Sequence, residues 1–534
     1  MSVKTDNEHY ARTERYAKEV QNLYFQIADH VARISSTQEF KAGIFTFKDY
    51  PVLNRMIDKL IDSLRKSMLV VIRSGISNEW DNANENNDAL VKYLSSKINL
   101  PEKKYQTRNL KALEAFQGRK INGLGLSERV WNYATQYKTE LEQALDVGIA
   151  DGRSAAQLSR DIREYLREPE KLFRRVRDKN GILKPSKNAL KYNPGGGVYR
   201  SSYKNAMRLT RTEINQSYRE ADYLRWQQMD FVVGIEVRRS NREYACDVCE
   251  SLKGKYPKTF KFTQWHPQCR CHAISILATE KELLESIEND KEVQSKNEIK
   301  EVPDNFKNWM KENEDRVVRA KTLPFFIQNN LQFVDSNTIK ERSILELMEK
   351  SKSAETSVSS LSNSIAEKFG GYSTPVNFKS YDSIKRKANS DYNGNVNKIQ
   401  DSVRTTIILP EKNIEKCLEY IQKNTNFIRI KIQTPDKFMG YSGTITNVKT
   451  NVDVIGEIQV NTAKMIYAKE EPKTAKVILG VNEWNRIKKE TGMPGGLGHK
   501  YYEEFRKLNK NIPEQAKRMI ELDKLSNEYY KHFR

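Results

Sequence analysis

Apolar residues recur at intervals of three and four over much of the first half of the chain, the spacing of one face of an α-helix. The clearest such stretch runs from Val130 to Leu145, and 208–226 repeats the pattern. Ser154 follows a break at Gly152 and is placed to cap a further helix that continues to Tyr165. We therefore expect residues 1–150 to be mainly helical.

Beyond about residue 360 the pattern changes, because short runs with strand periodicity now alternate with helical ones. In the strand 428–432, for example, isoleucines alternate with Arg429 and Lys431. Cys417 falls on the apolar face of a helix predicted over 413–424 and is read as a core residue. Further strands are predicted over 403–409, 443–450 and 454–460. This part is expected to form an α+β domain with a mixed sheet.

The 534 residues are 38% hydrophobic and 30% charged, which is typical of a globular protein of about three or four domains. The apolar runs are short, as at 68–72, and the first sixteen residues contain no apolar signal region. We expect no membrane span. The pattern divides the chain into a helical region (1–150), a cysteine-containing domain (151–278), a linker (279–302), a helical spacer (303–350) and the α+β domain (351–534).

The formal net charge of +21 indicates a polyanionic partner and is distributed unevenly. Residues 151–225 carry an excess of nine positive charges, and residues 361–534 carry an excess of ten. Within 171–211 there are twelve basic residues and one acidic residue, Asp178. Such a run binds phosphate backbones without sequence preference, or it is a solvated loop between helices.

Four of the five cysteines lie close together, in the pattern Cys246-x2-Cys249-x16-His266-x2-Cys269-x-Cys271. Thiolates and imidazole at this spacing suit a tetrahedral, structural Zn²⁺ site in a small zinc-knuckle-like β element. Cys246, Cys249 and Cys269 are the strong candidates, and the fourth ligand is either His266 or Cys271. The alternative is a group of reduced thiols without metal. A catalytic zinc is disfavoured because no general base lies nearby in the sequence.

The order of these motifs resembles the phage head-morphogenesis family, the Mu F-like minor capsid proteins. The shared elements are Arg211-Thr212-Glu213, then the CxxC pair followed by Gly254, then His266-Pro267-Gln268-Cys269-Arg270-Cys271. The resemblance covers about residues 100–278. It implies contacts with phage portal and capsid proteins and, through the basic segment 171–211, with packaged DNA.

Two acidic residues of the C-terminal part fall on separate predicted strands, Asp401 at the start of one and Glu457 within another. Carboxylates that converge from two strands can hold Mg²⁺. Gln459 shares a sheet face with Glu457 because the two are two residues apart. The basic cluster Lys385–Lys387 at a predicted helix can hold phosphates. Each residue also has an ordinary structural explanation, as a strand-end cap or a solvated surface charge.

Their order resembles the RelA/SpoT-type nucleotide pyrophosphokinases, which have a nucleotidyltransferase-like fold. The resemblance covers about residues 361–510 and rests on "K-x-x-x-S-I-x-x-K", "D-x-x-R", "G-Y" and "E-I-Q-x-x-T" segments. It implies that a Mg²⁺ site and a site for ATP and its acceptor lie in this domain. It implies that Asp401, Glu457 and Gln459 act in catalysis and that Asp401 and Glu457 hold Mg²⁺. It implies that Lys379, Lys387 and Arg404 bind ATP. Tyr441 and His499 would bind the acceptor, with Thr462 supporting the site.

The sequence departs from the housekeeping enzymes of that family at four positions. Arg404 replaces a Gly, Thr406 and Asn377 replace Arg, and Ile445 replaces a His. Arg404 and the late His499-x2-Tyr502-Glu503 are more like the toxin branch. The acceptor is thus left open between an adenosine or guanosine nucleotide and the 3′ end of tRNA.

Together the two resemblances imply a phage or prophage minor head protein with a C-terminal pyrophosphokinase toxin, found in the virion and in the bacterial cytoplasm. An immunity protein would then be a partner. The first alternative is a structural head protein with a catalytically inactive nucleotide-fold tail. The second is a non-enzymatic DNA-binding head protein.

Overall fold

The structure is a computed structural model that describes residues 3–40, 45–98, 100–150, 152–167, 176–177, 183–184, 201–240, 246–436 and 439–534. The chain forms two compact units. The N-terminal unit comprises residues 1–314 and 320–334, and the C-terminal unit comprises 315–319 and 335–534. The five-part division predicted from the sequence is finer than these two units and stays a prediction.

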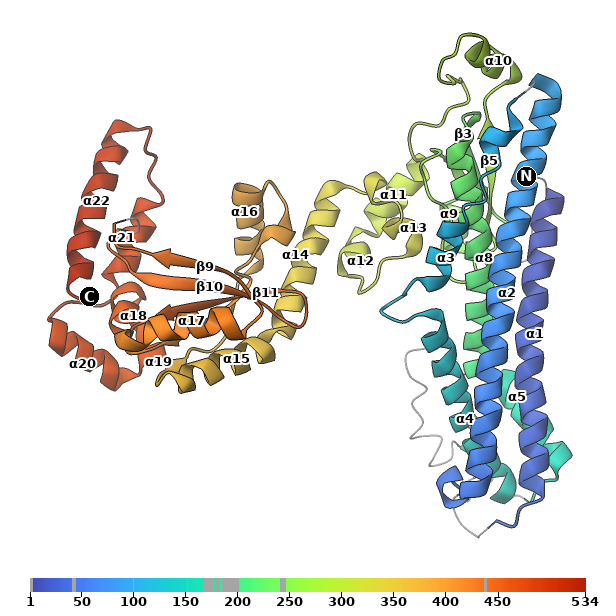
Figure 1. The fold of residues 1–534 in the computed structure, drawn as a ribbon, viewed down its shortest axis with the longest axis horizontal. Helices are drawn as coiled ribbons and strands as arrows, with labels where there is room; N and C mark the ends of the chain where they lie inside the picture. Colours follow the sequence, from blue (N-terminus) through green and yellow to red (C-terminus); the bar gives the residue numbers. More distant parts are fainter. Residues whose placement is uncertain are drawn as a thin grey trace. The chain divides into compact units, whose positions relative to one another are not determined.

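Long helices form the frame of the N-terminal unit, and α1, α2, α4 and α8 run side by side (Figure 1). The predicted helices at 130–145, after Ser154 and at 208–226 are confirmed as parts of α4, α5 and α8. The bounds are α1 Val3–Ser36, α2 Pro51–Ile98, α3 Leu110–Gly118, α4 Leu126–Ala150, α5 Ala155–Arg167 and α8 Ser202–Gln228.

The 48-residue helix α2 packs closely against α8. Gly75 lies at the closest approach, since a Cβ atom there would stand 2.4 Å from the side chain of Ile214. The buried side chains of α2 recur at three- and four-residue spacing, so one stripe of the helix faces the core. Examples are Leu53, Ile57, Ile61, Leu64, Met68, Ile72 and Ile76.

A three-stranded antiparallel sheet of order β4-β3-β5 adjoins the helices and brings the cysteines together. Its strands are β3 Val232–Arg238, β4 Gly254–Tyr256 and β5 His272–Leu277, with the short helix α9 Asp247–Ser251 between the first two. A two-stranded ladder, β1 Val176–Arg177 with β2 Leu183–Lys184, lies in the basic segment. The sequence predicted a small β element in the region of the cysteines, and this three-stranded sheet lies there.

The predicted linker 279–302 begins with helix α10 Glu280–Glu288, which Thr279 starts with a reciprocal capping box. Its last part is attached to the N-terminal unit, because the Ile299 amide donates to the Val233 carbonyl at 3.1 Å. Short helices follow: α11 Asp304–Glu312, α12 Glu314–Arg319, α13 Phe325–Gln328 and α14 Ser336–Ser353.

The C-terminal unit is built on a mixed sheet of order β6-β8-β11-β10-β9, with β7 also paired to β8. Strands β8 and β11 are parallel, and the other pairs are antiparallel. The mixed α+β character expected of this part is therefore confirmed. The strands are β6 Tyr372–Ser373, β7 Asn377–Phe378, β8 Val403–Ile408, β9 Phe427–Gln433, β10 Gly443–Lys449 and β11 Ile455–Asn461.

One face of this sheet is covered by α15 and α17 (Figure 1), against which Ile458 and Val460 pack in a core with the fully buried Cys417. Because side chains alternate along a strand, Glu457 and Gln459 point to the opposite face. The helices of this unit after α14 are α15 Glu355–Lys368, α16 Tyr381–Tyr392, α17 Ile414–Asn424, α18 Ala463–Lys469, α19 Pro472–Leu479, α20 Val481–Thr491, α21 Leu497–Phe505 and α22 Pro513–Lys531.

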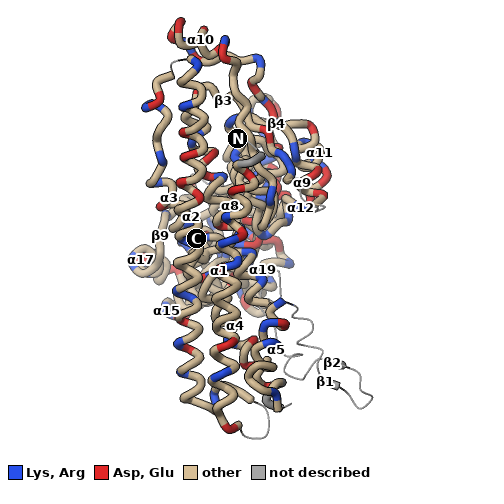
Figure 2. Tube along the Cα trace, turned by 90° about the vertical axis from the view of Figure 1, so that its right-hand side faces the viewer, with Lys and Arg blue, Asp and Glu red and all other residues tan. Residues whose placement is uncertain are grey.

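Acidic and basic residues are interspersed along the helices (Figure 2). Most of the basic segment 171–211, for which DNA binding was predicted, lies outside the described residues. Among the helices that the structure describes, none combines the length and the apolar character needed to cross a bilayer.

Candidate functional site

A carboxylate held by two lysines lies at the start of β8 in the C-terminal unit. Asp401 Oδ2 accepts hydrogen bonds from Lys379 Nζ at 2.7 Å and from Lys387 Nζ at 2.8 Å. Lys379 directly follows β7, and Lys387 is on α16, whose N-cap Ser380 accepts from the Ser383 amide. Three segments thus bring together residues separated by up to 22 positions.

The pKa shifts of Asp401 and Lys387 favour the charged form of each. Burial alone would raise the pKa of the Asp401 carboxyl, but the bonds from Lys379 and Lys387 outweigh burial and hold that pKa below its usual range. Burial would likewise lower the pKa of Lys387, yet its bond to Asp401 and the more distant charge of Glu457 raise it. Asp401 and Lys387 therefore form a charged pair at neutral pH, and Lys379 is the second donor to the same carboxylate oxygen.

Glu457 lies on the sheet face opposite α15 and α17, two strands from the edge strand β9. Its Oε1 accepts from Gln459 Nε2 at 2.7 Å, and its side chain is largely buried. In the parallel ladder Glu457 is paired with Arg404, and in the antiparallel ladder it is paired with Asn447. Paired residues point to the same face, so all three project over the same surface of the sheet.

Tyr441 lies beside this face, in the loop before β10. Its hydroxyl accepts from Asn461 Nδ2 at 2.6 Å, and Lys469 Nζ stands 5.4 Å from the centre of its ring. Lys469 Nζ is also 3.5 Å from Gln459 Oε1, which connects the tyrosine to the glutamate strand. Thr462 caps the following helix α18 by accepting from the Met465 amide.

His499 is set apart from these residues within the described structure. It lies on α21, is partly exposed and makes no hydrogen bond or ion pair there. The neighbouring Gly498 contacts Tyr530, whose ring lies 5.6 Å from that of Tyr441. The predicted acceptor role of His499 thus stays a prediction.

Several polar residues of the same face were not singled out from the sequence. Arg429 on β9 pairs with Asn447 in the ladder and donates from Nε to Asn447 Oδ1 at 2.7 Å. Lys431 follows two residues later on the same face of β9. The alternation of isoleucines with these basic residues already indicated that Arg429 and Lys431 share one face of a strand. The order of the strands was needed to show that this is the sheet face that carries Glu457.

The oxygen ligands needed for Mg²⁺ are present in this group. Asp401 Oδ1 is buried and has no hydrogen-bond partner within the described part of the chain, although Oδ2 of the same carboxylate has two. A buried carboxylate oxygen without a partner is unfavourable and suits a hard cation. The chemistry of Asp401 therefore fits a divalent metal, and the roles of Asp401 and Glu457 as its ligands stay a prediction.

The five predicted zinc candidates are adjacent in the N-terminal unit. Ligand atoms of Cys246, Cys249 and His266 lie within 4.8 Å of one another, as do those of Cys249, Cys269 and Cys271. The sulfurs of Cys249 and Cys269 are 3.8 Å apart. Two thiolates of a tetrahedral zinc site, with Zn–S of about 2.3 Å, stand about 3.8 Å apart.

His266 is oriented as a metal ligand would be. Its Nδ1 is 2.9 Å from the Pro267 carbonyl, so that nitrogen carries the proton and Nε2 is left as the acceptor. Nε2 lies 3.2 Å from the Cys246 sulfur and 3.1 Å from the Cys249 sulfur. The arrangement fits a closed site of four ligands, and both candidates for the fourth ligand remain in position.

Helix α8 holds the loop that carries the later cysteines. The Gln268 amide donates to Thr212 Oγ1 at 3.2 Å, and Asn215 Nδ2 donates to the Cys269 carbonyl at 3.0 Å. Glu213, between them, points away and is bound by Arg119 and Arg129. The Arg211-Thr212-Glu213 motif therefore connects the cysteine loop to the helical frame.

No family model matches the chain. Over 165 residues it is 33% identical to the (p)ppApp synthetase toxin Tas1 of Pseudomonas aeruginosa (strain UCBPP-PA14). That alignment covers 31% of this chain and 37% of the relative, so the chain spans little more than a third of the length of the curated relative it matches. A solved complex between the Type VI effector Tas1 and its immunity protein matches at 30% identity, over 36% of this chain and 96% of that chain, with a TM-score of 0.33. Part of this chain is therefore similar in sequence to a pyrophosphokinase toxin.

Proposed function

We propose that the C-terminal unit is a toxin-type pyrophosphokinase that transfers the β,γ-pyrophosphate of ATP to a ribose hydroxyl of a nucleotide. The observation that carries this proposal is the position of Asp401 between two lysines, one of which, Lys387, is also affected by the charge of Glu457. Sequence similarity to a (p)ppApp synthetase toxin supports it and favours an adenosine nucleotide over the guanosine nucleotide and tRNA alternatives.

In the proposed reaction the acceptor hydroxyl oxygen forms a bond to the β-phosphorus of ATP. The bond from that phosphorus to the oxygen shared with the α-phosphate breaks, and AMP leaves. Glu457 is placed to take the hydroxyl proton, because Gln459 orients its carboxylate. Lys379, Lys387 and Arg404 bind the phosphates, and the Tyr441 ring stacks on the acceptor base.

Phosphoryl-type transfer depends mainly on positioning and on neutralising charge. Mg²⁺, held by Asp401 and Glu457, would supply charge neutralisation between the phosphate oxygens when bound. The two lysines are already fixed by Asp401 before ATP arrives, so little side-chain freedom is lost on binding.

The full-length chain should release AMP from ATP in the presence of Mg²⁺ and an adenosine nucleotide. The measurement is separation of nucleotides by ion-exchange chromatography, with ADP, GDP and total tRNA offered as acceptors in parallel. AMP release that requires one acceptor supports the enzyme. No turnover with any acceptor would favour an inactive nucleotide-fold tail.

For the N-terminal unit we propose a structural role in a phage head, with the toxin carried in the virion and acting in the bacterial cytoplasm. The order of Arg211-Thr212-Glu213 and the cysteine motifs supports it, as does the way α8 holds the cysteine loop. Portal and capsid proteins and packaged DNA are the proposed partners. An immunity protein belongs to the proposal, because the producing cell must be protected from the toxin.

We also propose that the cysteine cluster holds one structural Zn²⁺. The purified full-length chain should contain about one zinc per molecule by plasma mass spectrometry. Cys249→Ser should lose the metal, since Cys249 belongs to both groups of ligands, whereas Cys417→Ala, far from the cluster in sequence and in a different unit, should keep it. Between His266→Gln and Cys271→Ser, the variant that loses zinc identifies the fourth ligand. A folded chain without zinc contradicts the proposal.

A further inference from the structure

A second site lies in the N-terminal unit, in a pocket of about 400 Å³. Its walls come from the first turns of α1, the middle of α8, the end of β3 and the loop before β5. The pocket is separate from the carboxylate site, which belongs entirely to the C-terminal unit. Its volume is that of a small-molecule site.

Arginines outnumber carboxylates in the lining. Five arginines line the pocket, among them Arg211, Arg219 and Arg270, against two carboxylates, Asp6 and Glu14. Both carboxylates are already bound. Arg211 donates to both Glu14 oxygens at 2.9 Å, and Arg270 Nη2 adds a contact to Glu14 at 3.2 Å. The other two arginines, Arg238 and Arg239, are paired with Glu236 and Glu250, which lie outside the lining.

Arg219 is the most deeply buried of these arginines. Its side chain is only 2% exposed, and Nη2 donates to Asp6 Oδ1 at 3.1 Å and to the Cys271 carbonyl at 3.3 Å. Its Nε and Nη1 are buried and have no hydrogen-bond partner among the residues that the structure describes. The next carboxylate oxygen, Asp222 Oδ2, is 4.0 Å from Nη1. Burial raises the pKa of Asp222 to about 7, so at neutral pH this group carries only part of a negative charge.

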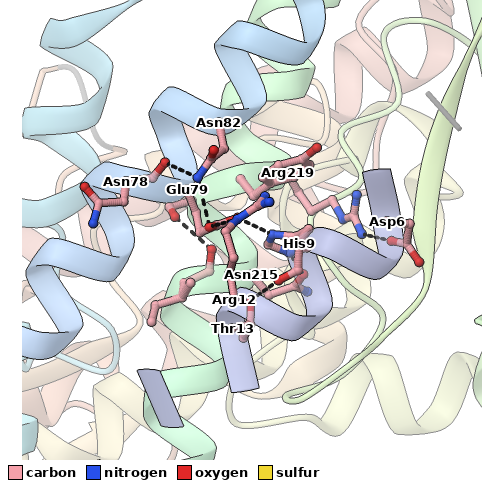
Figure 3. A network of polar contacts seen from close by, with 12 residues as sticks. Asp6, His9, Arg12, Thr13, Asn78, Glu79, Asn82, Asn215 and Arg219 are labelled. Carbon is pink, nitrogen blue, oxygen red and sulfur yellow. Dashed lines mark hydrogen bonds and ion pairs between the residues drawn. The ribbon is translucent and has the colours of Figure 1, made fainter. Parts of the chain in front are cut away.

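The wall behind Arg219 is a rigid polar network (Figure 3). His9 lies between Glu79 on α2 and Asn215 on α8, with its nitrogens 2.5 Å and 2.8 Å from their oxygens. Glu79, fully buried, also accepts from Arg12. These contacts fix the helices that carry Asp6 and Arg219, so the positive groups of the pocket are preorganised.

We propose that this pocket binds the phosphate group of a small phosphorylated molecule. A guanidinium presents its N–H groups in a planar fork that matches the oxygens of a phosphate, and such bonds are strongest where water is excluded. The unused donors of Arg219 are the feature that an anionic ligand would complete. A pocket of this volume admits a phosphate or a mononucleotide, and a DNA duplex is too wide to enter it.

The test is hydrogen exchange measured by mass spectrometry on the full-length chain, with inorganic phosphate, AMP or a 20-base-pair duplex added at constant ionic strength. Phosphate and AMP should slow exchange at least threefold in peptides from 3–36 and 266–277. Arg270→Gln, which replaces a side chain that is about one-third exposed, should remove most of this protection. The exposed Arg55→Gln on α2 is the matched control and should keep it.

Asp401→Asn should also keep the protection, so failure of the proposed enzyme activity leaves this result unaffected. Absence of protection by phosphate and AMP overturns the proposal. Protection that is equally strong in Arg270→Gln overturns it as well. Protection by the duplex alone would instead assign the arginines to a nucleic-acid surface.

Discussion

Replacing Glu457 by Gln is expected to lower AMP release by the full-length chain at least about 10³-fold. The amide keeps the size of the side chain but cannot take the proton of the acceptor hydroxyl and is a poorer ligand for a divalent cation. Because Gln459 can still bond to the remaining carbonyl oxygen, the fold should be unchanged. The same variant should no longer arrest growth when expressed in bacteria.

The matched control is Glu419→Gln on α17, an exposed glutamate whose side chain is 62% accessible. It should leave both turnover and growth arrest as in the natural chain. Circular dichroism and thermal unfolding of both variants check that the fold is retained. If Glu457→Gln is folded and still releases AMP or arrests growth, the catalytic assignment of Glu457 is wrong.

Replacing Glu213 by Ala should lower the free energy of unfolding of the N-terminal unit by about 3–5 kcal/mol. Glu213 is almost fully buried, and its two oxygens lie 2.8 Å from Arg119 Nη2 and 2.9 Å from Arg129 Nη1. Burial already lowers the pKa of Arg119. Removal of the carboxylate leaves two partly buried guanidinium groups without their shared counter-charge, which is costly.

Denaturant unfolding of the full-length chain, followed by hydrogen exchange in α8 peptides, measures this change. Glu114→Ala is the control, because Glu114 is an exposed residue of α3, and its loss should change stability by no more than about 0.5 kcal/mol. A Glu213→Ala chain as stable as the control would show that the two arginines find other partners. The ion pairs of Glu213 with Arg119 and Arg129 would then not be what stabilises this unit.

The elements of the fold could be predicted from the sequence because each depends on a local signal. The three- and four-residue spacing at 130–145 and the capping residue Ser154 are sufficient for α4 and α5. The alternation at 428–432 likewise predicts β9. It did not predict that Ile428 and Ile432 would be exposed, at 41% and 61%, because exposure depends on β9 being the edge of the sheet.

In the candidate site, too, the sequence determined some features and the tertiary structure determined others. The sequence determined which residue types are available: two carboxylates, a basic cluster, a glutamine two residues from a glutamate, and a cysteine group with metal-ligand spacing. Tertiary structure decided that Lys379 and Lys387 meet on one oxygen of Asp401. Ion pairs between residues distant in sequence leave no periodic signal, so no local pattern could show this.

Pairing between neighbouring strands explains how the other residues of the candidate site come together. The row of Arg429, Asn447, Glu457 and Arg404 arises only because β11 lies between β8 and β10 and because its register places them side by side. In the N-terminal unit, the burial of Arg219 beside Asp6 likewise joins residues 213 positions apart. The sequence by itself determined the helices, the strands and the chemistry that they carry. The strand order and the packing of α1 against α8 decided which of those groups meet, because hydrogen-bonded register and close packing are properties of the folded chain.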